Sequence, residues 1–158
     1  MIFNNLDEVL IYFQNINKGN EYLDYILSER TISKEWYEAI LEKVKKHNPK
    51  RVIDIGSNAN LFGYLFANEG IEYIGIDEEM ILKPIEGENI KFIHSNYYDV
   101  REKFKDDIII SCLCVGYLIP VKDVLGRVLI VNDHTGNGEN FKCTAKEIIL
   151  KRRKNKWI

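Results

Sequence analysis

The chain has 158 residues, a formal net charge of −2, and 46% hydrophobic against 29% charged residues. This length predicts one domain, 1–158, with a core of its own, and the small net charge gives no general attraction to nucleic acid or anionic membranes. The sequence holds no apolar run near the roughly 20 residues of a membrane span, and its first residues carry acids where a signal peptide has Lys or Arg.

Residues 1–47 are predicted to form a helical extension in front of the main domain. Apolar residues at helical spacing mark amphipathic faces over 6–13, 22–27 and 33–47. Gly19-Asn20 separates the first two helices, and Asn48-Pro49 ends the third after a group of lysines. Three roles are open for this extension: a cap over a cleft, a packing layer, or the surface of a homodimer. We favour the cap.

From residue 50 to 158 short apolar segments alternate with helices or loops. The predicted strands are 51–55, 71–76, 90–93, 108–113 and 127–131, with a helix at 61–69, a short helix or loop at 78–88 and a brief helix at 99–105. This alternation is typical of parallel strands joined by right-handed crossovers. We therefore predict an α/β fold: a Rossmann-like, mainly parallel sheet flanked by helices.

The end of the chain changes character. Residues 133–140 are predicted to be a turn-rich loop, and 147–158 a hairpin or a single long strand at the sheet edge. Lysines and arginines crowd the range 151–156. We interpret them as a solvated edge strand rather than an RNA-binding surface, because the domain as a whole is slightly acidic.

The junction after the first predicted strand is the most informative stretch. Asp54 lies near the end of that strand, Gly56 ends it, and Ser57, Asn58 and Asn60 favour a turn and a helix start. In an open parallel sheet such a turn lies at the carboxyl edge, where ligands bind. Acids gather at that predicted edge, namely Asp54, Asp77, Glu78, Glu79, Asp99 and Asp133. A cationic ligand therefore suits this edge better than a pyrophosphate.

Two nucleotide-binding patterns do not fit this turn. The sequence has no GxxxxGK[ST], which excludes a P-loop. A dinucleotide site needs GxGxxG so that a pyrophosphate can approach backbone N–H groups, and here Gly56 is followed by Asn58 and Leu61.

The pattern Asp54-Ile-Gly56-x-Asn58-x-Asn60, with Asp77 ending the next strand, resembles the first two motifs of class I S-adenosylmethionine-dependent methyltransferases. The segments 90–99 and 107–112 are similar to the third motif and the fourth strand of that family. The closing hairpin resembles the antiparallel strand that ends the family's sheet, so the resemblance implies an antiparallel edge. The resemblance covers about 50–158. Asparagine stands at two of the motif's glycine positions, and asparagine tolerates left-handed backbone better than other residues with side chains.

The resemblance implies S-adenosylmethionine as cofactor and methyl transfer to an acceptor, which is RNA, protein or a small molecule. Asp54 is then expected to face the ammonium group of the ligand, and Asp77 to accept hydrogen bonds from the ribose hydroxyls. Asn96 is expected to contact adenine, with Tyr97 stacking nearby. The remaining expected cofactor-binding residues are Gly56, Ser57, Asn58, Glu78 and Ser111. Asp133 and His134, after the fifth strand, are the candidates for a catalytic base.

Two other functions stay open. One is a non-catalytic binder of S-adenosylmethionine or a related nucleoside, a sensor or the subunit of a complex. It is favoured by Ser111-Cys-Leu-Cys114, which stands where amino-directed methyltransferases have an Asn/Asp-Pro-Pro-aromatic turn. The other is a nucleotide- or NAD-binding Rossmann protein, which the acidic edge disfavours.

The cysteines give a last expectation. Cys112, Cys114 and Cys143 are odd in number and form no CxxC pair. We therefore expect no disulfide framework, and we expect a cytoplasmic location. Their spacing matches no zinc motif, so no metal site is predicted.

Overall fold

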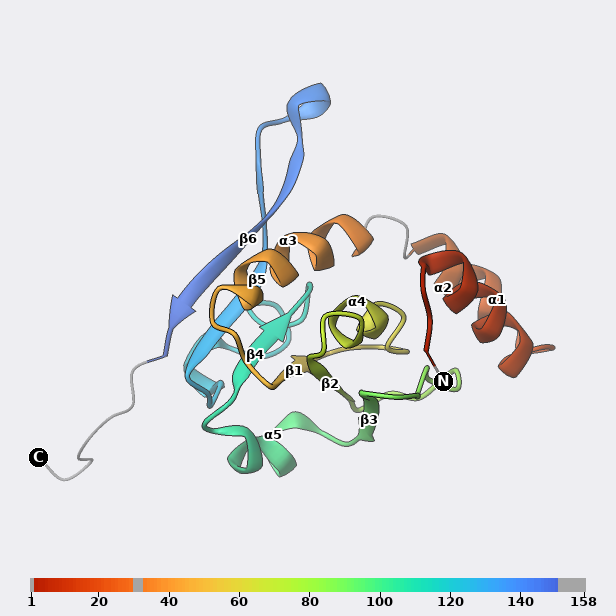
Figure 1. Cartoon of the computed structure of the whole chain (residues 1–158), viewed down its shortest axis with the longest axis horizontal. Coiled ribbons are helices and arrows are strands. Elements are labelled where there is room, and N and C mark those ends of the chain that lie inside the picture. Colours follow the sequence, from red (N-terminus) through yellow and green to blue (C-terminus); the bar gives the residue numbers. More distant parts are fainter. Residues whose placement is uncertain (1, 30–32, 151–158) are drawn as a thin grey trace, which may run out of the picture.

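The computed structural model describes residues 2–29 and 33–150 (Figure 1). The helices are α1 (Leu6–Ile16), α2 (Leu23–Glu29), α3 (Ser33–Lys45), α4 (Gly63–Ala67) and α5 (Tyr97–Val100). The strands are β1 (Arg51–Ile55), β2 (Glu72–Asp77), β3 (Ile90–His94), β4 (Ile108–Ser111), β5 (Val128–Thr135) and β6 (Lys142–Ile149). Three short 3-10 helices complete the elements: η1 (Arg101–Phe104), η2 (Val121–Asp123) and η3 (Gly138–Asn140).

The six strands form one sheet in the order β3-β2-β1-β4-β5-β6. The first five strands run parallel, and β6 pairs antiparallel with β5. The predicted Rossmann-like sheet with its antiparallel edge is therefore confirmed. β1 and β2 are neighbours, with Asp54 opposite Gly75, so the ends of these two strands meet at one edge.

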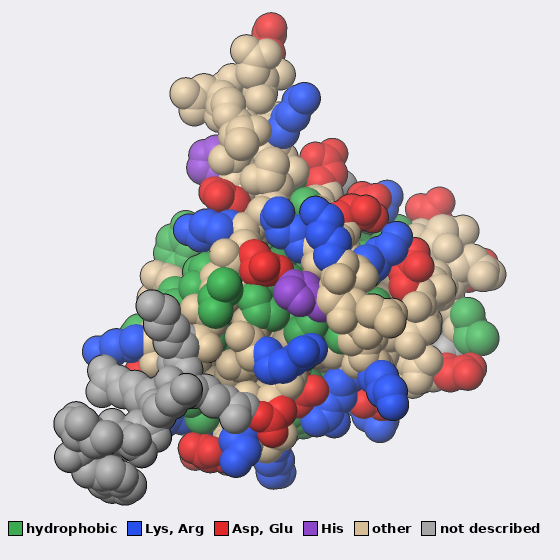
Figure 2. Space-filling model, turned by 60° about the vertical axis from the view of Figure 1, so that its left-hand side comes forward, with side chains coloured by type: hydrophobic (Ala, Val, Ile, Leu, Met, Phe, Trp, Pro, Cys, Tyr) green, Lys and Arg blue, Asp and Glu red, His purple; other side chains and the backbone are tan. Residues whose placement is uncertain are grey.

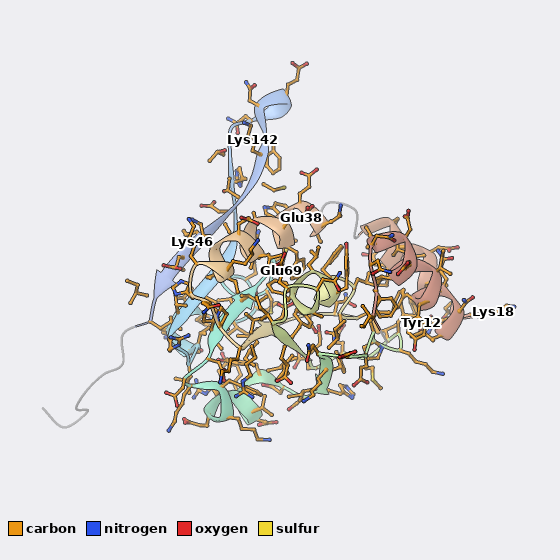
Figure 3. The ribbon with its side chains drawn as sticks, in the orientation of Figure 1. Tyr12, Lys18, Glu38, Lys46, Glu69 and Lys142 are labelled. Carbon is orange, nitrogen blue, oxygen red and sulfur yellow. The ribbon has the colours of Figure 1, made fainter. Side chains whose placement is uncertain are left out.

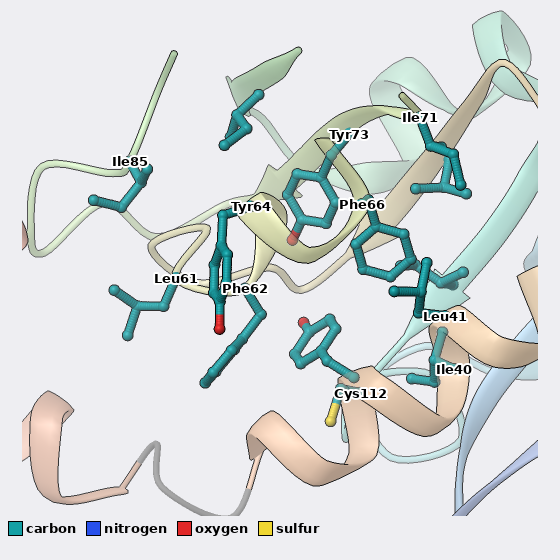
Figure 4. Close-up of a cluster of buried hydrophobic side chains, with 14 of the residues drawn as sticks. Ile40, Leu41, Leu61, Phe62, Tyr64, Phe66, Ile71, Tyr73, Ile85 and Cys112 are labelled. Atoms are coloured by element: carbon teal, nitrogen blue, oxygen red, sulfur yellow. The ribbon is translucent and has the colours of Figure 1, made fainter. Parts of the chain in front are cut away.

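Helices cover both faces of the sheet. α3 and α4 pack on one face, and α5 with η1 on the other (Figure 1). α3 buries Tyr37, Ile40, Leu41 and Val44, which follow the i, i+3, i+4, i+7 spacing of a single helix face. Figure 4 shows aromatic side chains around α4 filling the space toward α3. No helix within residues 2–29 and 33–150 has the length and apolarity needed for a membrane crossing.

The C-terminal hairpin departs from the prediction. β5 continues to Thr135 and pairs with β6, which starts at Lys142, so the first three residues of the predicted loop 133–140 are strand. The ladder satisfies the backbone groups of these polar residues, which side-chain periodicity does not reveal. Figure 2 shows this hairpin projecting from the body. The predicted edge strand 147–158 is described only to residue 150, and the basic residues 151–156 lie outside the described part.

Other boundaries also shift, each for a local reason. α4 begins at Gly63 rather than 61 because the left-handed Asn60 keeps the chain in a turn, and it ends at Ala67 rather than 69. α5 begins at Tyr97 rather than 99 because the side chain of Asn96 caps it. β4 ends at Ser111 rather than 113, because Leu113 has a positive φ of 70°. Residues 78–88 form a loop.

Asp54 is fully buried between the sheet and α3. Its Oδ2 accepts a hydrogen bond from the Tyr37 hydroxyl at 2.6 Å and another from the Tyr73 hydroxyl. Because Tyr37 belongs to α3 and Tyr73 to β2, this carboxylate joins the N-terminal extension to two strands of the sheet. Burial, reinforced by the charge of Asp54, raises the pKa of Tyr37 and of Tyr73 well above the usual 10.0.

These raised pKa values predict how stability depends on alkaline pH. Above pH 10 the tyrosines ionise in the unfolded chain while the folded chain holds their protons, so each group removes about 1.4 kcal/mol of stability per pH unit. Tyr37→Phe is expected to lower the free energy of unfolding at pH 7 by about 1.5–3 kcal/mol, through loss of a hydrogen bond to a buried charge. It is also expected to make the decline above pH 10 less steep.

Urea unfolding at pH 7 and at a series of pH values above 10 measures the free energy of unfolding and its alkaline decline. Tyr12→Phe on α1 (Figure 3) is the matched control, because its hydroxyl has no part in the Asp54 cluster. An alkaline slope that Tyr37→Phe leaves unchanged would contradict the assignment.

Candidate functional site

A cleft of about 630 Å³ opens at the carboxyl ends of β1, β2 and β3 and beside the segment that follows β4. Its volume lies in the range of pockets for small molecules and cofactors. Most of the predicted cofactor-binding residues line it: Gly56, Asn58, Asp77, Glu78, Asn96 and Tyr97. The edge of the sheet that the sequence singles out is thus the edge where the cleft lies.

The turn after β1 is built from left-handed residues packed tightly on β2. Gly56, Asn58 and Asn60 have φ values of 74°, 56° and 60°, so asparagine takes the left-handed backbone as predicted. A Cβ added at Gly75 of β2 would lie 1.9 Å from Asn60 Oδ1 and 2.4 Å from Ser57 Oγ. A glycine at position 75 therefore allows the turn to lie directly on the sheet.

The backbone N–H groups of this turn are occupied within the protein. Those of Gly56 and Ser57 donate to the Ile76 carbonyl at 2.8 and 3.2 Å. The Asn58 N–H donates to Asp77 Oδ2 at 2.8 Å, and the Asn60 N–H to the Ser57 carbonyl at 3.2 Å. Phosphate cradles depend on N–H groups that point at the ligand. These four do not, which argues against a pyrophosphate at this turn.

Asp77 links the turn to the end of β2 while facing the cleft. Besides the bond from Asn58, its Oδ1 accepts from the Glu79 N–H at 3.0 Å. Each carboxylate oxygen has two lone pairs, so both oxygens still accept a further hydrogen bond from a ligand hydroxyl. The protein thus fixes the orientation of this carboxylate before any ligand arrives.

The end of β3 contributes the next wall. Asn96 Oδ1 accepts from the Tyr98 N–H at 2.9 Å and so caps α5, while Asn96 Nδ2 donates to Glu78 Oε2 at 3.3 Å. Tyr97 is buried, and its hydroxyl accepts from the Leu125 N–H at 3.0 Å. This wall therefore offers one exposed amide beside one fixed aromatic ring.

Three of the predicted cofactor-binding residues do not line the cleft. Asp54 lies below the turn with its two tyrosines, and Ser57 faces Gly75. Ser111 is buried; its hydroxyl donates to the Ile55 carbonyl at 3.2 Å and accepts from the Val115 N–H at 2.9 Å. Asp54 and Ser111 thus connect neighbouring elements through side-chain hydrogen bonds, whereas the buried Ser57 hydroxyl packs on Gly75 without a hydrogen-bond partner in the described part of the chain.

The two candidates for a catalytic base also lie away from the cleft, on the projecting β5–β6 hairpin. The His134 ring stacks on Phe141 with 5.1 Å between ring centres. The Asp133 carbonyl accepts a hydrogen bond from Trp36 Nε1 at 2.7 Å. The Asp133 contact connects the hairpin to α3, the His134 contact lies within the hairpin, and neither residue lines the cleft.

The charge of the cleft has one sign. Its charged side chains within residues 2–29 and 33–150 are Asp77, Glu78 and Glu79, with no lysine, arginine or histidine among them. Burial first, and then the charges of Asp54, Asp77 and Glu78, raise the pKa of Cys114 to about 11. At neutral pH this cysteine is therefore a thiol and not a nucleophilic thiolate. The described residues contain no cluster of three or more potential metal ligands.

Several residues that line the cleft are not among those named from the sequence, although the role favoured there for residues 1–47 is a cap over a cleft. Tyr25 and Ile26 of α2 line it, so the N-terminal extension forms one wall. Leu113, Leu118 and Ile119 after β4 form another. The signal for this second wall is present in the sequence, because 112–119 is an uncharged run outside any strand or helix.

Comparison with known proteins gives a fold. No family model and no curated protein sequence matches the chain. Phosphoethanolamine N-methyltransferase 2 of Haemonchus contortus, solved with phosphomonomethylethanolamine and S-adenosylhomocysteine, matches with a TM-score of 0.52 and 14% identity, over 87% of this chain and 38% of its own. The plantazolicin methyltransferase BamL matches with a TM-score of 0.48 and 21% identity, over 82% of this chain and 57% of its own. An S-adenosylmethionine-dependent methyltransferase of Clostridium acetobutylicum matches with a TM-score of 0.47 and 14% identity, over 82% of this chain and 81% of its own.

The first of these likenesses extends over most of the described chain, which itself spans 38% of that protein's length. The chain therefore has the fold of the class I S-adenosylmethionine-dependent methyltransferases.

Proposed function

We propose that the cleft binds S-adenosylmethionine and that the protein transfers its methyl group to an acceptor. The charge of the cleft carries this proposal: three carboxylates line it, and the described part of the chain contributes no basic side chain. S-adenosylmethionine is a cation without phosphate, whereas NAD and nucleotides bring phosphates that these carboxylates repel. The internally bonded N–H groups of the turn support the same choice.

The described side chains suggest how the ligand lies. Asp77 accepts from the ribose hydroxyls, and the Asn96 amide and Tyr97 ring bind adenine on the β3 side. Because β1 separates β2 from β4 in the sheet, the amino-acid part then lies over Gly56 and Asn58, and the sulfonium faces β4.

Bound S-adenosylmethionine supplies an electrophilic methyl carbon. A lone pair of the acceptor atom forms the new bond to this carbon, the C–S electron pair stays on sulfur, and a proton of the acceptor passes to water. The residues of the cleft contribute by holding donor and acceptor in line.

One observation favours the alternative, a non-catalytic binder. Asp133 and His134 lie outside the cleft, and no described histidine or lysine lines it. The described bases of the cleft are then the carboxylates of Asp77, Glu78 and Glu79, at the end of β2 and away from β4. Methyl transfer from labelled S-adenosylmethionine separates the two functions, since both include binding and one includes turnover.

Isothermal titration calorimetry with S-adenosylmethionine, S-adenosylhomocysteine and NAD tests the ligand class. We expect the first two to bind and NAD to bind at least about 100-fold more weakly, a difference of about 2.7 kcal/mol. A dissociation constant for NAD equal to that of S-adenosylhomocysteine would overturn the assignment of the cleft.

Asp77→Asn tests the proposed ribose contact. The amide keeps one acceptor oxygen but loses the charge and one acceptor, so we expect the dissociation constant of S-adenosylhomocysteine to rise by about 10–100-fold. Glu69→Gln is the matched control, because Glu69 follows α4 outside the cleft and undergoes the same change of charge (Figure 3). Unchanged affinity in a folded Asp77→Asn variant would remove Asp77 from the site.

A further inference from the structure

The segment 112–119, here called the post-β4 lip, exposes apolar side chains beside the cleft. Its sequence, Cys-Leu-Cys-Val-Gly-Tyr-Leu-Ile, contains no charged residue. Leu113, Tyr117 and Leu118 are 47%, 80% and 79% exposed. Leu113 and Leu118 line the cleft together with Ile119. Apolar side chains gathered on a surface in this way mark a binding site.

The lip is held in a defined conformation. The Gly116 N–H donates to the Ile119 carbonyl at 2.7 Å, and the Leu118 N–H to the Cys114 carbonyl at 3.0 Å. Leu113 has a positive φ of 70°, which is rare for a bulky residue, and its N–H donates to Asn132 Oδ1 at 2.8 Å. Strained residues of this kind cluster at functional sites. The backbone hydrogen bonds thus keep the Leu113 and Leu118 side chains exposed, although exposed apolar surface and the positive φ of Leu113 both cost free energy.

The lip is continuous with the proposed donor site. A Cβ added at Gly56 would lie 2.5 Å from Cys114 Cβ, so the turn after β1 and the lip are in direct contact. The lip occupies the β4 side, which the proposed donor orientation leaves to the sulfonium and the acceptor. The acids of the cleft come from the end of β2. One cleft thus has an acidic half and an uncharged half.

The uncharged half selects its occupant by chemistry. A phosphate, carboxylate or ammonium group placed there would lose its hydration without meeting an opposite charge. An apolar molecule would instead remove the leucine side chains from water, which is favourable by about 25 cal/mol per Å². A phosphorylated or nucleic-acid acceptor is therefore disfavoured.

We propose that the post-β4 lip is the acceptor half of this cleft and that the methyl acceptor is an uncharged, apolar small molecule. This inference rests on the proposed function, which supplies the donor in the other half. The acceptor atom gives up its proton to water as written above, so it belongs to a group that releases a proton readily, such as a thiol or phenol.

Two dyes that differ by one charged group test the lip directly. N-phenyl-1-naphthylamine is uncharged, and 8-anilino-1-naphthalenesulfonate is a close analogue with a sulfonate. In fluorescence titrations we expect the uncharged dye to bind at least tenfold more tightly. Leu118→Asp is expected to weaken its binding at least tenfold, and the exposed side chain of Leu118 makes this variant compatible with folding. Ile11→Asp on α1, at a 62% exposed residue outside the cleft, is the matched control and is expected to change nothing.

A competition experiment separates the two halves. In the presence of saturating S-adenosylhomocysteine, the dissociation constant of the uncharged dye is expected to stay within twofold of its value without that ligand. Full displacement of the dye, equal binding of the two dyes, or unchanged binding by Leu118→Asp would overturn the proposal. Light scattering that shows a dimer dissociated by Leu118→Asp, without dye binding, would instead assign the lip to a second copy of the chain. Dye binding without any binding of S-adenosylhomocysteine would overturn the proposed function and the acceptor role with it, while the apolar site itself would stand.

Discussion

The buried carboxylate of Asp54 is the interaction on which the rest of the structure depends. A charge in a protein interior is tolerated only with close partners, and here Tyr37 and Tyr73 provide them. Because these partners come from α3 and β2, the requirement fixes the position of α3 on the sheet. It also fixes β1 against β2, directly before the turn that begins at Gly56. The N-terminal extension is thereby part of the same packed unit as the cleft.

The residues around this turn face two directions, the interior of the protein and the cleft. Asp54, Ser57 and Ser111 face inward. The hydrogen bonds of Asp54 and Ser111 connect β1 with β2 and with the end of β4, and Ser57 packs on Gly75 of β2. Gly56 and Asn58 face the cleft with their backbone close to the space a ligand would occupy. Asparagine replaces glycine here without loss of the left-handed geometry, because its short polar side chain tolerates positive φ. Neighbouring residues of this motif therefore alternate between the buried interior and the cleft.

The cleft joins two surfaces of different chemistry. Acids at the end of β2 favour a cationic nucleoside, and the uncharged lip after β4 favours an apolar molecule. The sheet order places these surfaces on opposite sides of β1. A donor that carries positive charge on sulfur and an acceptor that carries none would therefore meet over the central strand, each on the surface that suits it.

The sequence alone determined the class of fold, the edge of the sheet where the cleft lies and the tolerance of the asparagines for left-handed backbone. These features follow from periodicity, turn chemistry and the handedness of crossovers, all of which are local or general. Tertiary structure decided which motif side chains face the cleft, as the inward Asp54 and the cleft-facing Asp77 illustrate. It also paired β5 with β6 and brought Tyr25 of α2 and the lip to the cleft. The reason is physical: spacing in a sequence reports which residues are buried, whereas the partner that each one meets depends on packing between distant segments.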